Sequence, residues 1–444
     1  MQWRSNVLTT VEQDEDVISR ARSVGPVLVE AGGRIEANGG LTDDVVDALH
    51  EKRLFRLLLP RSIGGDELDL RTHAEVLEII ASYDASTAWC MSQGAGCAMA
   101  SAFLDHDVAR RLFGPRDAVL AWGAGIQGKA TRCEGGWRVT GKWAFASGSR
   151  HATLLGGHSF LFEADGSPIL KEDGRQRDRT MLMRREQATI HDVWDVMGLR
   201  GTGSDTFEVA DLFVPDEESL DRDDPAECRE PGPLYRCSTS LAYGVGFAAL
   251  QLGIARGMLD DLRELALTKT PRGASSSLRE SPVFQTQLAQ LEARYRAARA
   301  YLHHSAAEAD RRAAAGPLSL DDRVNLKLST VHVINDCVAI TNEAYRAAGA
   351  TAIFPSEPFE RRLRDCMTAS QQVQARVQNY QTAGRCLMGL EPDTTMFLFG
   401  RRRGTCRAGR PYFRLRGIVH GQVRPQRRGH RQRGDARACE YAGA

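Results

Sequence analysis

An aromatic ring and a hydroxyl stand two residues apart in the run Phe145-Ala-Ser147-Gly, in this chain of 444 residues. The run follows Gly141-Lys-Trp143, and we expect it at the end of a β-strand. A ring placed there can stack on a flat ligand, and the hydroxyl can form a hydrogen bond with the edge of that ligand. An ordinary strand end with a Ser-Gly turn explains the same residues equally well.

The segment 194–205 holds the densest group of small and polar residues. Its sequence is Trp-Asp-Val-Met-Gly-Leu-Arg-Gly-Thr-Gly-Ser-Asp. Glycines alternate there with Arg200, Thr202 and Ser204, a composition that can bind an anion or hold the oxygen-rich edge of a cofactor. A surface loop between two strands is an equally good interpretation of this segment alone.

The segment 123–128 matches the GxGxxG pattern of dinucleotide-binding loops. Such a loop binds a pyrophosphate only between a strand and a helix, because the N-terminus of the helix contacts the phosphates. A hairpin is predicted to follow here, so we exclude a Rossmann site. Trp122 and the glycines that begin at Gly123 could instead let the backbone approach a flat ligand. A hairpin loop beside a core tryptophan is the simpler interpretation.

Histidine and cysteine spacing gives no sign of a metal site. The ten cysteines form no CxxC pair, and none lies at zinc-ligand spacing from a histidine. The sequence also lacks GxSxG, Walker and HExxH motifs. Scattered cysteines are typical of reduced thiols in a cytoplasmic protein, and we find no signal peptide and no run of transmembrane length. We therefore expect a cytoplasmic protein that does not bind membranes.

Residues 10–116 have the periodicity of helices. We expect helices that begin near Thr42, that cover 70–83, and that run from 88 to about 113. The first helical face is formed by apolar residues spaced three and four apart: Val17, Ala21, Val24, Leu28 and Ala31.

Two further blocks follow. Residues 117–228 change to the period of two that strands show, and a Gly-Gly pair at 135–136 signals a hairpin. Residues 229–393 are helical again, where Ser319 begins a long helix with a capping box and Gly349 ends it. We expect a four-helix arrangement in this last block.

Charge divides the chain into an acidic body and a basic tail. Residues 401–444 contain thirteen Arg, no Lys and two acids, a net charge of +11, so that residues 1–400 carry a net charge of −10. An acidic body argues against binding of nucleic acid, which needs a basic face. The segment 394–444 has no apolar period, and its Arg-rich composition cannot offset the cost of ordering a chain, so we expect disorder there.

Several sequence segments within about residues 12–393 resemble, in their order and spacing, those of the acyl-CoA dehydrogenase superfamily. They are the segments 54–65, 84–89, 136–147, 359–365 and 384–393. The resemblance implies a mainly α fold with a central β domain: an N-terminal helical domain, a small β-barrel domain and a C-terminal four-helix bundle. It also implies a homotetramer, assembled as a dimer of dimers through the C-terminal domain.

Two branches of this superfamily differ in chemistry. Acyl-CoA dehydrogenases use FAD and need a carboxylate base, either shortly after an Arg-Asp pair, here Arg364-Asp365, or on the first long helix of the last domain. No carboxylate follows Asp365 for many residues, and the segment 238–258 contains none. Amides cannot act as general bases near neutral pH. The other branch comprises flavin-dependent monooxygenases that act on small aromatic or heteroaromatic molecules, and the sequence favours it.

The monooxygenase signatures resemble the segments 122–126, 143–148 and 198–205. By this resemblance, Phe145 packs beside the isoalloxazine, Ser147 forms a hydrogen bond near flavin N5, and Arg200 lies at the edge of the active site. Cofactor binding is assigned to Trp122, Gly123, Phe145, Ser147, Arg200, Thr202 and Ser204, a substrate pocket to Trp89, Gln93, Cys97 and Gln371, and catalysis to Ser147, Arg200 and Gln372.

The resemblance also implies a mechanism and a partner. A separate flavin reductase supplies reduced flavin, FADH2 or FMNH2, which reacts with O2 to a C4a-hydroperoxide in a dry pocket. Ser147 would support that adduct, whose distal oxygen passes to the aromatic substrate. Several oxygenases carry a histidine where this chain has Gln372, and one subgroup has the Gln-Gln pair found here at 371–372.

Two alternatives stay open. An acyl-CoA dehydrogenase with a displaced base would lose its flavin colour when acyl-CoA is added. A catalytically silent member of the fold would bind no flavin.

Overall fold

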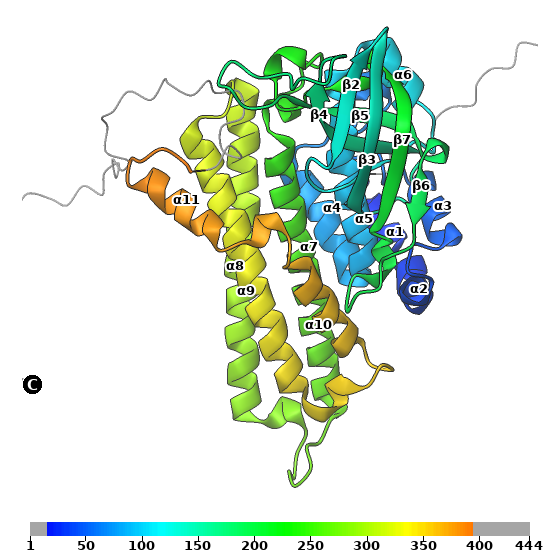
Figure 1. Ribbon diagram of the computed structural model, residues 1–444. Coiled ribbons are helices and arrows are strands. Elements are labelled where there is room, and N and C mark those ends of the chain that lie inside the picture. The colour runs from blue at the N-terminus through cyan, green and yellow to red at the C-terminus, as the bar shows by residue number, and fades with distance from the viewer. Residues whose placement is uncertain (1–15, 394–444) are drawn as a thin grey trace, which may run out of the picture.

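The computed structural model describes residues 16–393, and Figure 1 shows their arrangement. The predicted tail, 394–444, and residues 10–15 of the predicted first domain lie outside the described residues. The helices of the first block are α1 (Val17–Ser23), α2 (Gly25–Asn38), α3 (Asp43–Glu51), α4 (Leu70–Tyr83), α5 (Ala85–Ala98) and α6 (His106–Phe113).

The apolar face predicted at the start of the chain is confirmed, because all five of its residues are buried. Pro26 stands in the first turn of α2 and starts a second helix there. The prediction of one helix from 88 to about 113 is wrong. α5 ends at Ala98, a 3-10 turn follows over Met99–Phe103, and Leu104 is extended. Asp105 then precedes α6, so two helices stand where one was expected.

The second block forms one eight-stranded, mostly antiparallel sheet. Its strands follow the order β6-β7-β3-β2-β4-β5-β8, and β1 pairs in parallel with β4. They are β1 (Leu120–Trp122), β2 (Gly128–Cys133), β3 (Gly136–Ala146), β4 (Leu154–Phe162), β5 (Asp178–Arg184), β6 (Thr189–His191), β7 (Asp205–Pro215) and β8 (Ser219–Leu220). The GxGxxG segment joins β1 to β2, and the predicted β2–β3 hairpin follows it, so the exclusion of a Rossmann unit is confirmed.

The third block consists of α7 (Thr239–Thr268), α8 (Pro282–Ala315), α9 (Leu320–Ala348), α10 (Pro358–Ala369) and α11 (Gln378–Leu387). α7, α8 and α9 run side by side, and their lower ends extend beyond the sheet in Figure 1. The capping box at Ser319 is present, since its hydroxyl oxygen accepts from the Asp322 N–H and its own N–H donates to the Asp322 carboxylate. Gly349 ends α9 with φ 62°, as predicted.

One apolar core runs through the first and third blocks, whereas most buried side chains of the sheet form a second core around Trp143 and Phe207. A buried polar cluster also joins the two helical blocks. Glu78 on α4 accepts hydrogen bonds from the Tyr295 hydroxyl (2.6 Å) and Arg299 Nε (2.7 Å) of α8, and bonds to His303 Nε2 (2.9 Å).

Candidate active site

β3 ends in a strained turn in which one side chain, Phe145, is exposed and another, Ser147, is buried. Phe145 adopts φ 62°, a left-handed conformation that few non-glycine residues accept, at a shift of register between β3 and β7. Its ring is 60% exposed and contacts only the edge of the Trp194 ring among the described aromatic pairs. Ser147, by contrast, is 7% exposed, and the Gly148 N–H donates to Thr202 O at 2.9 Å.

The Ser147 hydroxyl belongs to a chain of buried polar side chains. Trp89 Nε1 donates to Ser147 Oγ at 2.9 Å, and Ser147 Oγ lies 2.7 Å from Ser204 Oγ. Ser204 Oγ lies 2.7 Å from Thr202 Oγ1, which in turn donates to Leu199 O at 2.9 Å. Four predicted site residues from three separate segments therefore form one hydrogen-bonded unit, which we call the hydroxyl chain.

Three of the predicted pocket residues lie on α5, and a cap fixes the position where this helix starts. Asp84 caps the helix, and its Oδ1 accepts from both the N–H (2.7 Å) and the hydroxyl (2.8 Å) of Thr87. Trp89, Gln93 and Cys97 follow at intervals of four, which places them on one face. Of all residues in α5, Gln93 alone retains appreciable exposure. This face is thus the one where the buried helix reaches an accessible surface.

The other end of this aromatic region surrounds Trp122. Phe247 of α7 stacks on Trp89 (4.4 Å between centroids), Tyr243 stacks on Phe247 (5.7 Å), and the Trp122 ring meets Tyr243 edge-on (6.3 Å). Gly123 is required beside Trp122, because an added Cβ would lie 2.3 Å from Trp143 Cβ. Together these rings, of which only Tyr243 is not buried, form a continuous row from Trp89 to Trp122, which we call the aromatic surface.

Arg222 supplies positive charge at this aromatic surface, and sequence reasoning did not single it out. Its guanidinium lies 4.4 Å from the centroid of Trp122, and it forms no ion pair with a carboxylate among residues 16–393. Burial raises the pKa of Tyr243 well above its usual range and lowers that of His158 well below its own, so both are neutral near pH 7. The position of this arginine on a tryptophan face was not recognisable in the sequence, because residues 122 and 222 lie near opposite ends of the block 117–228.

The remaining predicted residues do not join the hydroxyl chain. Arg200 Nη1 donates to Val196 O at 2.9 Å and lies 3.4 Å from Asp195, so its side chain folds back on its own loop. Gln371 is exposed, and its side chain bonds only to Ser370 among the described residues. Gln372 Oε1 accepts from the Gln374 N–H at 2.6 Å, while its buried Nε2 has no partner in the described part of the chain.

Asp365 holds the loop that carries the hydroxyl chain, a role that sequence reasoning missed although it quoted the residue. Its Oδ1 accepts from the Leu199 N–H at 2.6 Å, and Leu199 has a left-handed φ of 52°. Gly198 allows this approach, since a Cβ there would lie 2.1 Å from Arg364 O. Burial raises the pKa of Asp365 to about 7.

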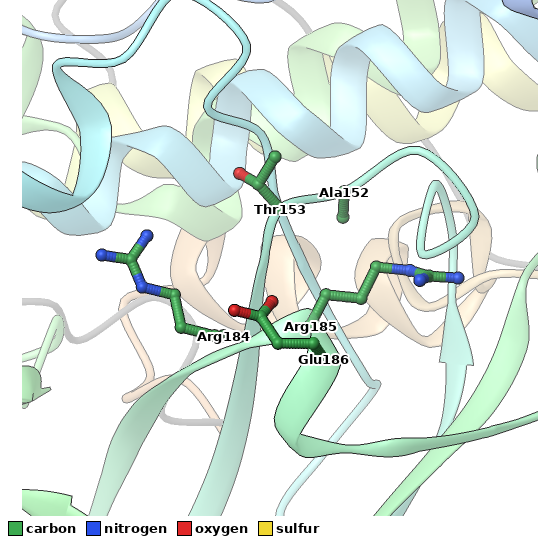
Figure 2. A pocket seen from close by; sticks show the side chains of 5 residues that line it. All are labelled: Ala152, Thr153, Arg184, Arg185 and Glu186. Atoms are coloured by element: carbon green, nitrogen blue, oxygen red, sulfur yellow. The ribbon is translucent and has the colours of Figure 1, made fainter.

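An open depression of about 380 Å³ lies beside the turn after Ser147, and Figure 2 shows its lining. Arg184 and Arg185 extend in opposite directions there, with Glu186 between them. Arg185 Nε donates to Ser149 O at 2.7 Å and so ties the turn to the end of β5. None of the predicted site residues lines this depression, so it is not the predicted pocket. Its residue Arg185 supports the turn instead.

Comparison with known proteins shows which proteins the chain resembles. Residues 245–376 match the family model described as acyl-CoA dehydrogenase, C-terminal domain. The chain is 29% identical to indole-3-acetate monooxygenase of Pseudomonas putida, over 81% of this chain and 90% of that protein. It is 28% identical to the flavin-dependent monooxygenase oxygenase subunit HsaA of Rhodococcus jostii, over 78% and 91%. The solved structure of XiaF from Streptomyces sp. with FADH2 and glycerol superposes with a TM-score of 0.79 at 25% identity, over 85% of this chain and 96% of that one.

These findings confirm the resemblance to the acyl-CoA dehydrogenase superfamily and to its monooxygenase branch. The fold is acyl-CoA-dehydrogenase-like, the chain is a flavin-dependent monooxygenase, and its cofactor is flavin. No helix within residues 16–393 is long and apolar enough to cross a membrane. The residue roles and the domain boundaries stay predictions.

Proposed function

We propose that this chain is the oxygenase component of a two-component system: it takes reduced flavin from a separate reductase and oxygenates a small aromatic acid. The observation that carries the proposal is the hydroxyl chain that contains Ser147, two residues from the exposed ring of Phe145. The name of the relative in Rhodococcus jostii, an oxygenase subunit, supports a separate reductase.

The residues at the end of β3 suit an isoalloxazine. Phe145 offers an exposed aromatic face although its backbone is strained, an arrangement that costs energy and is typical of functional sites. Ser147 has unfilled hydrogen-bonding capacity, because a hydroxyl can make three bonds and only Trp89 and Ser204 bond to it among the described residues. When bound, reduced flavin supplies the electrons that activate O2.

The aromatic surface and Arg222 suit the substrate. Trp122 and Tyr243 can pack against an aromatic ring, and the Arg222 guanidinium can bind a carboxylate in a bidentate geometry. The name of the relative in Pseudomonas putida refers to indole-3-acetate, which has both groups. We therefore assign substrate binding to Trp89, Gln93, Cys97, Trp122, Arg222 and Tyr243.

Dehydrogenation of acyl-CoA is disfavoured by the lack of a suitable base. α7 has no carboxylate before Asp260. Asp365 is buried and its Oδ1 accepts the Leu199 N–H, so that it holds a loop. A base that takes an α-proton must reach that proton, and general-base catalysis contributes about 10²–10⁴ in rate.

One experiment tests the proposed function. The purified chain is mixed with a flavin reductase, NADH, FMN or FAD, and indole-3-acetate under ¹⁸O₂, and a second sample receives acyl-CoA and an artificial electron acceptor without reductase. We expect label in the aromatic product of the first sample and no acceptor reduction in the second. Acceptor reduction in the second sample without label in the first would refute the proposal.

We also propose a homotetramer. Apolar side chains are exposed around α11, where a second copy could cover them: Val373, Val377, Met388 and Leu390. Light scattering at several concentrations should give four times the chain mass of 48.8 kDa, and a monomer at all of them would rule the tetramer out.

A further inference from the structure

We infer that the hydroxyl chain has a preferred donor direction that makes Ser147 an acceptor toward its ligand, so that the site favours reduced over oxidised flavin. The inference rests on the proposed function, since it takes Ser147 to meet flavin N5. It goes further in assigning to Thr202 and Ser204 control over the redox state that is bound, although neither residue needs to touch the flavin.

The partners at the two ends of the chain decide which direction makes the most hydrogen bonds, and the carbonyl of Leu199 is the one that separates the two directions. An indole N–H can only donate, so Ser147 Oγ accepts from Trp89 Nε1. A carbonyl can only accept, so Thr202 Oγ1 donates to Leu199 O. Between these ends, Ser147 donates to Ser204 and Ser204 donates to Thr202. This arrangement makes four hydrogen bonds and uses every hydroxyl proton within the chain.

The opposite direction makes one bond fewer. If Thr202 donates to Ser204 and Ser204 to Ser147, the Ser147 proton is free, but the bond from Thr202 to Leu199 O is lost. That carbonyl still accepts from Trp194 Nε1 at 3.0 Å, so the loss is a single hydrogen bond and leaves no buried acceptor unpaired. In the preferred direction Ser147 presents only a lone pair to a ligand.

The two redox states of flavin differ at N5, which the proposed function places at Ser147. Reduced flavin carries an N5–H donor, which matches the Ser147 lone pair. Oxidised flavin has only an acceptor at N5, so it can bond to Ser147 only when the hydroxyl chain has the opposite direction and the Ser147 proton is free. A neutral buried hydrogen bond is worth about 0.5–1.5 kcal/mol. At 1.4 kcal/mol per tenfold, the reversal weakens oxidised flavin by roughly threefold to tenfold.

Thr202→Val tests this direction at a distance from the ligand. Without the Thr202 hydroxyl, Ser204 loses its acceptor and can donate to Ser147, which frees the Ser147 proton at no cost. We expect oxidised FMN and FAD to bind roughly threefold to tenfold more tightly than in the parent, with reduced flavin bound no better. The dissociation constants are measured by anaerobic titration of each redox state. Ser204→Ala should change the ratio in the same direction.

Thr330→Val is the matched control. Thr330 is buried, and its hydroxyl donates to Lys327 O, three residues earlier, at 2.9 Å, as that of Thr202 does to Leu199 O. Its ratio of dissociation constants should equal that of the parent. An unchanged ratio in both Thr202→Val and Ser204→Ala, with flavin still bound, overturns the inference and leaves the proposed function standing. Failure of the parent chain to bind either redox state overturns both.

Discussion

The polar side chains at the end of β3 and those that follow α10 differ in how far the protein itself completes their hydrogen bonds. Ser147 and its neighbours are short hydroxyls whose positions are fixed by the backbone, and each of them has partners. Gln371 is exposed, and Gln372 keeps a buried amide nitrogen without a partner among residues 16–393. The first group is organised before a ligand arrives, whereas Gln372 has bonding capacity left for one.

The comparison predicts its largest effect at Ser147. Ser147→Ala should release about tenfold to a hundredfold more hydrogen peroxide per product formed, because the buried N5–H of the cofactor is left without a partner, which costs about 1–3 kcal/mol. The measurement is the ratio of peroxide to product, with thermal unfolding unchanged. Ser149→Ala is the control, since Ser149 lies in the same turn and donates to Gly203 O at 3.2 Å. Equal peroxide release in the two variants would contradict a specific role for Ser147.

A second effect is expected at Arg222, on the aromatic side of the site. Arg222→Gln should raise KM for indole-3-acetate about tenfold and leave KM for indole unchanged, because only the acid loses a charge-assisted hydrogen bond. Arg132→Gln is the control: Arg132 also stacks on a tryptophan ring, at 4.1 Å from Trp137, but is paired with Asp216. A similar rise for both substrates would exclude recognition of the carboxylate.

Asp365 makes the loop between the two regions sensitive to pH. Its pKa is raised to about 7 when folded, from an ordinary value of 3.8, so the folded chain holds a proton that the unfolded chain releases. Its contribution to stability is therefore present below about pH 4 and is lost as pH rises through about 7. The loss is at most about 4 kcal/mol, at about 1.4 kcal/mol per pKa unit. Asp365→Asn should remove it, so denaturant unfolding between pH 4 and 8 should show a smaller change than in the parent.

The smallest effect is expected after α10. Gln371→Ala should change the free energy of unfolding by less than about 0.5 kcal/mol, because its side chain is exposed. Gln372→Ala should cost about 1 kcal/mol, because the bond from the Gln374 N–H is lost. If Gln372 contacts the ligand as predicted, Gln372→Ala also weakens turnover while Gln371→Ala does not. Equal turnover in both variants would show that the side chain of Gln372 only accepts the hydrogen bond from the Gln374 N–H.

The sequence predicted the parts of the fold that rest on periodicity and local chemistry. α4 begins at Leu70 and ends at Tyr83 as expected, because Asp69 caps it and its apolar spacing is regular. The break after Ala98 was missed, since its small apolar residues suit both a helix and a 3-10 turn.

The site was predictable where glycine and hydroxyl spacing constrains the backbone, as in Ser147 and Ser204. The link from Trp89 to Ser147 spans two domains and has no local signal, and neither has the position of Arg222. Such contacts depend on how the sheet packs against α5 and α7, which spacing along the chain does not determine.

The Glu78 cluster has a consequence for how this molecule melts. Because its carboxylate binds α8 from α4, and because the two helical blocks share one apolar core, neither block can lose its structure while the other keeps it. Calorimetry should record both as one cooperative transition. The sheet, with most of its buried side chains in a core of its own, is the part that can open first. On heating, the flavin would then dissociate before the helical blocks unfold.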